Sequence, residues 1–373
     1  MSVLAAIAVL ALLIVVHELG HFIAARSQGI HVNRFSLGFG PVLWKYQGPE
    51  TEYAIRAFPL GGFVGFPDDD PDSEIPPEDP NLLRNRPVLD RAIVISAGVI
   101  ANLIFAYFLL VAQIGTVGMP TLNFEPGVLV AQVFTQEDVA KTDITEGLAL
   151  AATQAGIKSG DVVLAVDGKE LGDSQTAIQS LKQLIEEHPN QLLSLLIQRD
   201  DKQLTFSVTP SASKDGTGRI GVQLAPNGKI ERYHATSVFD AFGHGATEFQ
   251  RIVFLTVQGF GQLISNFGQT AAQVAGPVKI VELGASIAST DAGNLFQFAA
   301  LISINLAIIN ILPLPALDGG QLAFLLIEGL RGKPLPTGIQ DGVMQTGLMV
   351  LLGLGIFLIV RDTANLPWIQ SLF

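Results

Sequence analysis

The sequence predicts a polytopic α-helical membrane protein with about four transmembrane helices and one inserted β-rich domain. Of its 373 residues, 49% are hydrophobic and only 15% are charged, whereas charged residues make up about a quarter of a soluble chain. The apolar residues gather in four runs, which we expect to be spans, at 3–25, 92–115, 292–317 and 342–360. Each run approaches or exceeds the roughly 20 residues that a helix needs to cross a bilayer core.

Charge and composition exclude several classes of function. The formal net charge of −12 argues against a nucleic-acid partner. The chain has no cysteine, which rules out disulfides and thiolate metal sites. Acidic residues and prolines concentrate at 67–80, which we interpret as a solvated linker. The first run lacks a basic leading region, so we expect it to remain as a span rather than to be removed as a signal peptide.

Basic residues near the span ends predict the orientation, because they favour the cytosolic side. They follow the first run, precede the second and separate the third from the fourth, as Arg26, Arg34, Arg84, Arg86, Arg91, Arg331 and Lys333. The two short loops are therefore expected to be cytosolic or stromal. Both termini and residues 116–291 are expected to be periplasmic or lumenal, although Arg361 after the fourth run argues the other way.

The long segment between the second and third runs predicts a small β-rich domain at 121–225. Short alternating or apolar stretches predict strands at 129–134, 162–166, 193–198 and 204–208, and a helix at 174–187. Glycines 156 and 160 and the dipeptide Asp167-Gly168 mark turns. This pattern resembles a PDZ domain of the bacterial protease type. Such domains bind extended peptides by strand addition, and the alternative is a β-rich domain without a ligand.

A fifth uncharged run, at 252–278, differs from the four spans. Polar residues recur in it at helical spacing, as Gln258, Gln262, Ser265, Gln269 and Gln273. We therefore predict an interfacial amphipathic helix within 240–285, lying on the outer leaflet. The alternative, a fifth span, would invert the last two spans relative to the first two.

The first run carries the pattern His17-Glu18-Leu19-Gly20-His21. Residues four apart lie on one helix face, so His17 and His21 can bind one metal ion. Glu18 lies about 100° round the helix, where it can approach a water on the metal and act as a general base. Two histidines and a glutamate in a span are costly unless they have partners. The alternative is a polar cluster that joins helices.

A catalytic zinc usually has three protein ligands, and Asp318 is the candidate for the third. It closes the stretch 310–320, in which Pro313 and Pro315 break helical hydrogen bonding. Broken backbone at membrane depth is tolerated where it lines a cavity or is buried by protein. Asn310 lies two turns before Asp318 on nearly the same face. Its amide is a candidate to stabilise an oxyanion, with an interhelical hydrogen bond as the alternative.

These motifs resemble the site-2 protease family, especially the bacterial regulator-of-sigma-E protease and its cyanobacterial and plastid relatives. The resemblance covers nearly the whole chain. It implies intramembrane cleavage of single-span proteins, with zinc bound by His17, His21 and Asp318 and with Glu18 as the base. Asn310 and Pro313 match motif positions near that site. Asn102 matches a GxxxN motif at 98–102 and is expected to contact the substrate backbone or the site, with a structural contact as the alternative.

Residues 35–66 resemble the family's re-entrant hairpin on the cytosolic side. The sequence alone predicts strands at 42–46 and 51–58 around a turn at 47–49. A sheet edge there, including Gly61 and Gly62, would hold a substrate extended. The alternative is a cytosolic hairpin with no role in substrate binding.

The sequence therefore predicts a zinc metalloendopeptidase whose core is formed by residues 1–115 and 292–373. The expected partners are single-span substrates such as anti-sigma factors or membrane-tethered regulators, the lipid bilayer and a peptide ligand of the PDZ domain. The expected location is a bacterial inner membrane or a plastid membrane. A metal transporter and an inactive PDZ scaffold are the rivals; few polar residues in the second and fourth runs argue against the first, and Glu18 against the second. The enterobacterial relative has two PDZ domains, whereas this chain has room for one.

Overall fold

The computed structural model describes residues 2–70, 73–135, 150–172, 175–213, 216–270 and 274–366. These residues form two compact units. One comprises residues 1–119 and 234–373, and we call it the membrane unit because it contains every long apolar helix of the described chain. The other comprises residues 120–233, and we call it the insert unit.

Four helices in the described part of the chain are long and apolar enough to cross a membrane, as the sequence predicted. They are α1 (Ser2–Ser27), α2 (Val88–Thr116), α9 (Leu295–Ile311), which extends a short 3-10 turn η4 (Ala292–Asn294), and α11 (Thr337–Ala364). The predicted third run of 292–317 is wrong at its end, because the helix stops at Ile311. Pro313 and Pro315 lack the N–H groups that would continue it. A separate helix, α10 (Asp318–Arg331), follows.

Helix α2 lies at the centre of the membrane unit, where it packs against α1 and α9. A β-carbon on Gly20 of α1 would lie only 2.5 Å from the carbonyl oxygen of Ala97, so this small residue allows the two helices to approach closely. On the other side, the buried hydroxyl of Ser303 on α9 donates to the carbonyl of Asn102 at 2.8 Å. Both contacts fix α2 relative to its neighbours.

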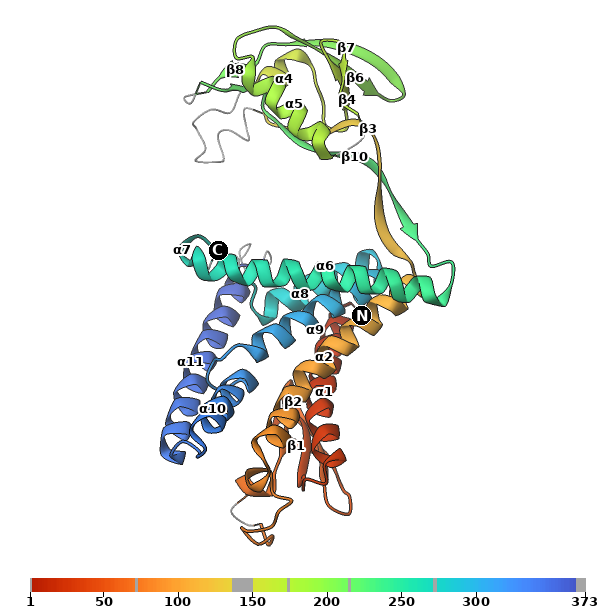
Figure 1. Ribbon diagram of the computed structural model, residues 1–373. Coiled ribbons are helices and arrows are strands. Elements are labelled where there is room, and N and C mark those ends of the chain that lie inside the picture. Colours follow the sequence, from red (N-terminus) through yellow and green to blue (C-terminus); the bar gives the residue numbers. More distant parts are fainter. Residues whose placement is uncertain are drawn as a thin grey trace. The chain divides into compact units, whose positions relative to one another are not determined.

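A pair of long strands, β1 (Arg34–Gln47) and β2 (Glu52–Gly65), follows α1. The prediction of strands at 42–46 and 51–58 found the turn but underestimated both lengths. The turn is closed by a hydrogen bond from Gly48 N–H to the carbonyl of Thr51. In Figure 1 the two strands lie beside the end of α1 that is farther from the N-terminus.

The register of β1 and β2 shows that each strand bends back on itself. Residues 34–37 pair in parallel with 52–55 and, on their other side, in the opposite direction with 62–65. Residues 44–47 pair with 52–55 in the opposite direction. The four segments therefore lie in the order 44–47, 52–55, 34–37 and 62–65. Residues 62–65 form an edge of this small sheet.

Three helices replace the single amphipathic helix predicted within 240–285: α6 (Val238–Ser265), α7 (Phe267–Thr270) and α8 (Pro277–Thr290). Helix α6 begins before the predicted polar stripe, because the Ser237 hydroxyl caps it by accepting from the N–H of Asp240. It packs against α2 and α9 and lies at the end of the membrane unit that is farther from β1 and β2 (Figure 1). Gln273 of the predicted stripe lies outside the described residues.

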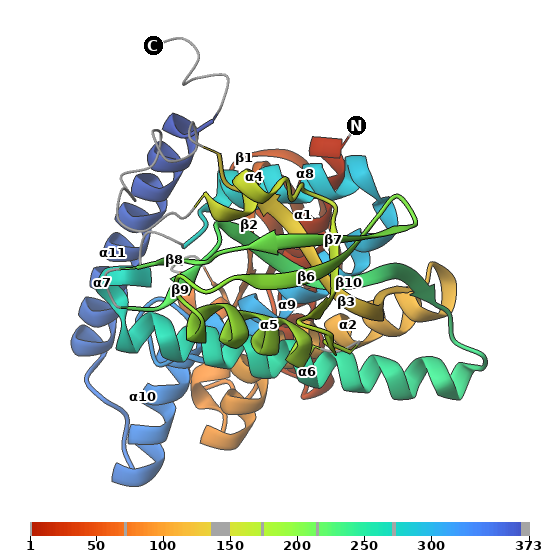
Figure 2. The same cartoon turned by 90° about the horizontal axis from the view of Figure 1, so that it is seen from above.

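The insert unit is built on a sheet of strand order β10-β3-β4-β6-β7, with β5 paired to β4. In Figure 2, β6 and β7 run side by side. The predicted strands and helix correspond to five elements, β3 (Met119–Val133), β4 (Val162–Val166), β6 (Leu193–Arg199), β7 (Lys202–Val208) and α5 (Gln175–Glu187). The elements that were not predicted are α4 (Ala151–Ala155), β5 (Lys169–Glu170), β8 (Ser211–Ala212), β9 (Gly218–Arg219) and β10 (Val222–Tyr233).

An ion pair between the partly exposed Arg199 and the buried Asp161 supports the turn that the sequence marked with Gly156 and Gly160. Arg199 donates to both oxygens of Asp161, each at 2.7 Å, and the N–H of Lys158 donates to one of them at 2.8 Å. Burial alone would raise the pKa of Asp161, but these hydrogen bonds outweigh burial and lower it. Because the folded-state pKa is lowered, the pair stabilises the unit at neutral pH, and this stabilisation is lost only as the pH falls through that lowered value.

Candidate metal centre and active site

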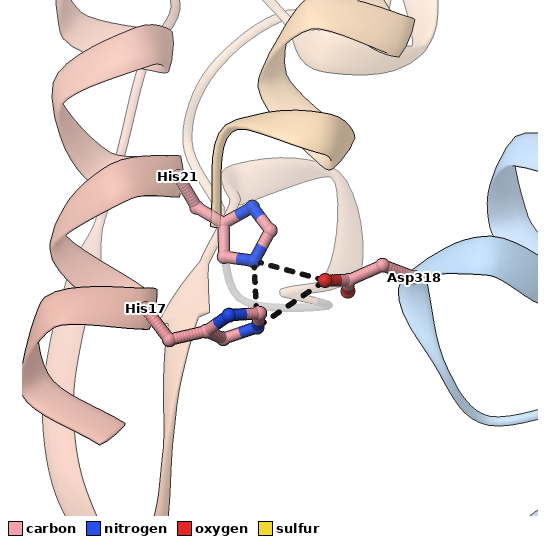
Figure 3. Close-up of side chains that lie close together, drawn as sticks. All are labelled: His17, His21 and Asp318. Atoms are coloured by element: carbon pink, nitrogen blue, oxygen red, sulfur yellow. Dashed lines mark hydrogen bonds and ion pairs between the residues drawn. The ribbon is translucent and has the colours of Figure 1, made fainter. Parts of the chain in front are cut away.

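Three side chains from two distant parts of the membrane unit converge on one point. His17 and His21 extend from α1, and Asp318 extends from the first turn of α10 (Figure 3). The two Nε2 atoms lie 3.2 Å apart. Asp318 Oδ2 lies 3.2 Å from Nε2 of His17 and 3.4 Å from Nε2 of His21. The three residues that the sequence selected as ligands are therefore brought together.

A hydrogen bond to Nδ1 of His21 fixes the tautomer of the ring and so leaves Nε2 able to bind a metal ion. Nδ1 of His21 lies 2.8 Å from the carbonyl oxygen of Val94 on α2. A carbonyl only accepts, so Nδ1 carries the proton and donates. In the neutral ring Nε2 then has a free lone pair directed at the cluster. The Val94 carbonyl was invisible to sequence reasoning, because a backbone acceptor leaves no signal in residue identity.

Asn102 lies behind the other imidazole. Its side chain is fully buried, and its Nδ2 lies 3.5 Å from Nδ1 of His17. Its Oδ1 is buried and has no hydrogen-bond partner among the described residues. The predicted contact of Asn102 with the substrate backbone stays a prediction, because no substrate is present. The other prediction, a contact with the site, fits.

The segment between α9 and α10 delivers Asp318. Ala316 has a φ of +69°, a left-handed conformation that is costly for a residue with a β-carbon. Gly319 follows at a position where a β-carbon would lie 2.1 Å from the carbonyl oxygen of Leu312. Asn310 and Asp318 thus lie on different helices, and the prediction that they share one face of a continuous helix is wrong. The prolines turn the chain between them.

The geometry of the three atoms fits zinc. Tetrahedral coordination with bonds of about 2.0–2.1 Å places ligand atoms about 3.3 Å apart, close to the spacings of 3.2 to 3.4 Å found here. Asp318 Oδ2 is buried and makes no hydrogen bond within the described residues. Two imidazole lone pairs and a carboxylate oxygen at these distances repel one another unless a cation or proton lies between them. Nitrogen and oxygen donors are a set that zinc accepts.

Glu18 lies beside the metal cluster and against the sheet edge. The backbone N–H of Val64, in the edge segment 62–65, donates to its carboxylate. A β-carbon on Gly62 would lie 2.9 Å from Cγ of Glu18, so the absence of a side chain lets the strand approach. Gly62 was predicted to bind substrate, and a side chain at this position would collide first with Glu18.

The remaining predicted residues occupy different surroundings. Nδ2 of Asn310 lies 3.3 Å from Nε2 of His17, which places the amide beside the cluster. Pro313 is exposed in the segment between α9 and α10. Gly61 has a φ of +139°, in the region that favours glycine, at the bend that precedes the edge segment. No contact in the described residues assigns either Pro313 or Gly61 to a substrate.

A glycine on α2 provides a test of the cluster. A β-carbon on Gly98 would lie 2.4 Å from Nε2 of His21 and 2.7 Å from Cε1 of His17. Gly98→Ala is therefore expected to displace both rings and to weaken zinc binding more than about 100-fold, beyond the loss caused by an outer-shell partner. Zinc competition with a chelator measures the change. Gly115→Ala is the matched control, because its added carbon meets only Ala241 at 4.0 Å; equal zinc affinities of the two variants would contradict this geometry.

Comparison with known proteins identifies the family. The model of peptidase family M50 matches residues 5–354. The chain belongs to peptidase family M50, the site-2 protease family. It is 66% identical to "Putative zinc metalloprotease all3971" of Nostoc sp. over the whole of both chains. It is 48% identical to the chloroplastic membrane metalloprotease ARASP of Arabidopsis thaliana, covering 100% of this chain and 80% of that one. It is also 30% identical to the regulator of sigma-W protease RasP of Bacillus subtilis, covering 98% and 99%.

Family membership confirms the predicted activity of this M50 member. It is a zinc metalloendopeptidase and an integral membrane protein of a bacterial or plastid membrane, and a transporter or inactive scaffold is not favoured. A PDZ domain of the SdrC-like protein from Listeria monocytogenes is also similar, at 20% identity, covering 28% of this chain and 92% of that chain with a TM-score of 0.21. That score is too low to support an argument about the insert unit.

Proposed function

We propose that this M50 protease cleaves peptide bonds within transmembrane segments of single-span proteins, using zinc held by His17, His21 and Asp318 and Glu18 as the general base. The single observation that carries this proposal is the convergence of the two Nε2 atoms and Asp318 Oδ2 within 3.4 Å, beside Glu18. Zinc, when bound, supplies a Lewis acid that lowers the pKa of water to about 7 and polarises a carbonyl.

The chain's own residues perform the proton transfers. Glu18 removes a proton from the attacking water and later gives it to the leaving amine. The backbone N–H of Val64 interacts with this carboxylate and helps to hold it in place. Asn310 donates its amide N–H to the oxyanion that develops on the substrate carbonyl. Its position 3.3 Å from His17 Nε2 supports this role.

Asn102 acts as a positioning residue for His17. When Nε2 of His17 binds a metal, Nδ1 carries the proton and needs an acceptor. The oxygen and nitrogen of a side-chain amide are assigned from the hydrogen-bond network. If the Asn102 amide is flipped by 180°, its Oδ1, which otherwise has no partner among the described residues, accepts a hydrogen bond from the Nδ1–H of His17. Asn102→Leu is therefore expected to weaken zinc binding about tenfold. Unchanged zinc affinity in a folded variant would exclude this role.

The edge segment 62–65 is proposed to bind substrate. Helical peptide bonds are shielded and already hydrogen-bonded, so a spanning substrate must unwind to be cut. A strand edge whose Val64 N–H points toward Glu18 offers backbone groups to an extended chain. Gly61 and Gly62 would allow the substrate to approach closely, and the exposed Pro313 is proposed as a further substrate contact. Val64→Pro removes the N–H that holds Glu18 and also distorts the edge segment, so it should lower kcat and raise KM in a cleavage assay; an unchanged KM would contradict strand addition.

The insert unit is proposed to be a single PDZ domain on the periplasmic or lumenal side, with β1 and β2 re-entering the membrane from the cytosolic side. The strand order with β10 at an edge near α5 supports a peptide groove, and titration with C-terminal peptides tests it. Because the chain has no cysteine, single cysteines placed at Leu43 or Leu192, each 69% exposed, report sidedness. Labelling of both from one side would refute this orientation.

Removing the metal tests the proposed function. The purified protein, reconstituted with a single-span substrate such as a membrane-tethered anti-sigma factor, is expected to lose cleavage when zinc is chelated and to regain it when zinc is returned. Mass spectrometry of the products should place the cut inside the transmembrane segment. Cleavage that persists after the zinc content reaches zero would overturn the proposal, and so would a cut confined to the soluble part of the substrate.

A further inference from the structure

One ion pair in the membrane unit joins two helices that the proposed mechanism does not connect. Arg91, in the first turn of α2, pairs with Glu328, near the end of α10. The two residues are 237 positions apart in the chain. Both side chains are largely buried, with exposed fractions of 16% and 17%. By contrast, Lys182 and Glu186 of α5 form a surface pair with exposed fractions of 67% and 41%, of the kind that contributes little.

The rest of α10 offers few alternatives for holding its far end. Leu325 is its only buried large apolar residue, whereas Leu326 and Leu330 are 65% and 81% exposed. Its first turn is held by close backbone contact, since a β-carbon on Gly320 would lie 2.4 Å from the carbonyl oxygen of Leu314. Helix α10 packs against α2 and α9; it is held closely near Asp318, and about 15 Å away along its axis the ion pair with Arg91 joins its far end to α2.

Helix α2 is thus the common support of both halves of the metal centre. On one side its Val94 carbonyl accepts a hydrogen bond from His21, and its Gly98 leaves room for both histidine rings. On the other side it holds α10 through Arg91. We propose that the Arg91–Glu328 ion pair positions Asp318 against His17 and His21 and thereby sets the zinc affinity of the site. This inference rests on the zinc site proposed above, and Arg91 and Glu328 are positioning residues in it.

The burial of Arg91 explains why removing Glu328 should disturb the packing of α10 against α2. Arg91 Nε is buried without a hydrogen-bond partner in the described part of the chain, so Glu328 is the acceptor that balances this charge. Without it, the buried guanidinium gains by turning toward water, which moves α2 and α10 apart. A small rotation of α10 about its axis then swings the Asp318 carboxylate away from the two Nε2 atoms.

The experiment measures zinc affinity of the full-length protein in lipid nanodiscs by competition with a chelator. Glu328→Gln and Arg91→Gln are each expected to weaken zinc binding about tenfold, the lower end of the effect of outer-shell partners. The double variant Arg91→Glu with Glu328→Arg is expected to recover most of the loss. Arg331→Gln is the control, because it removes an exposed charge from the same helix and should leave zinc affinity unchanged.

A second measurement separates positioning from stability. Spin labels on cysteines at Ile23 of α1 and Leu330 of α10, which are 55% and 81% exposed, report the distance between the helices. The distribution should broaden in Glu328→Gln and narrow again in the swapped variant. Should Glu328→Gln not fold, Arg91→Lys, which keeps the charge, takes its place and should show the same changes to a smaller degree.

The outcomes distinguish this inference from the proposed function. If the parent protein binds zinc and the folded single variants bind it equally well, the positioning role is wrong and the zinc site stands. A swapped variant that is as weak as the single variants also overturns the role. If the parent protein itself binds no zinc, the proposed function has failed instead.

Discussion

Glu18→Gln is expected to lower kcat/KM for a single-span substrate about 10³-fold, within the range that general acid–base catalysis contributes, while zinc remains bound. Glutamine has nearly the shape of glutamate, and its Oε1 can still accept the N–H of Val64. The position of the side chain is thus preserved. What is lost is the ability to take a proton from water and return it to the leaving amine.

The measurement compares cleavage rates and zinc content of the same reconstituted preparations. Glu78→Gln, an exposed change in the acidic segment, should cleave at the parent rate and controls for the loss of one carboxylate. A Glu18→Gln protein that keeps its zinc and cleaves normally would show that another group acts as the base. One that has lost its zinc would mean that Glu18 holds the metal centre together.

Asp318→Asn is expected to produce the complementary defect. The neutral amide oxygen is a poorer zinc ligand than a carboxylate, so we expect zinc affinity to fall more than about 100-fold, beyond the range for outer-shell partners. Cleavage should disappear at low zinc concentration and return in part when zinc is raised. Glu18→Gln, by contrast, should not respond to added zinc. This difference separates a metal ligand from a proton carrier.

Zinc titration of activity and binding in the two variants provides the check. Asp341→Asn on α11 is the matched control, because it exchanges an exposed carboxylate for the same amide. If Asp318→Asn binds zinc like the control, the third ligand lies elsewhere. Its Oδ2 atom, within 3.4 Å of both histidine Nε2 atoms, would then be a neighbour of the metal only.

Sequence reasoning succeeded where the information is local. His17, Glu18 and His21 lie within two turns of one helix, so helical spacing alone places the histidines on a common face. Four apolar runs gave the four candidate spans, because the thickness of a bilayer fixes the length of a helix. The errors of the sequence analysis also came from its reliance on local patterns. The run through Leu317 was continued as a helix, although Pro313 and Pro315 end it and place Asp318 on α10.

Backbone partners were beyond the reach of the sequence. Nearly every residue type carries a backbone carbonyl and a backbone N–H. The identity of residues 94 and 64 therefore does not predict that their backbone groups contact His21 and Glu18. The sequence also showed no sign that α2 buries the side chain of Asn102 against His17. Only packing of α1, α2 and α9 decides which side of such a residue faces the site.

By itself the sequence determined that the chain is a membrane protein with a metal-binding helix and a candidate acid as third ligand. These conclusions follow from the length of the apolar runs and from the helical spacing of the histidines, which depend only on residues close together in the chain. The tertiary structure alone decided that Asp318 meets the histidines, that a sheet edge reaches Glu18 and that Arg91 holds α10. These depend on contacts between residues as many as 301 positions apart, from His17 to Asp318. Such contacts form only when α2 packs between the helices that carry them.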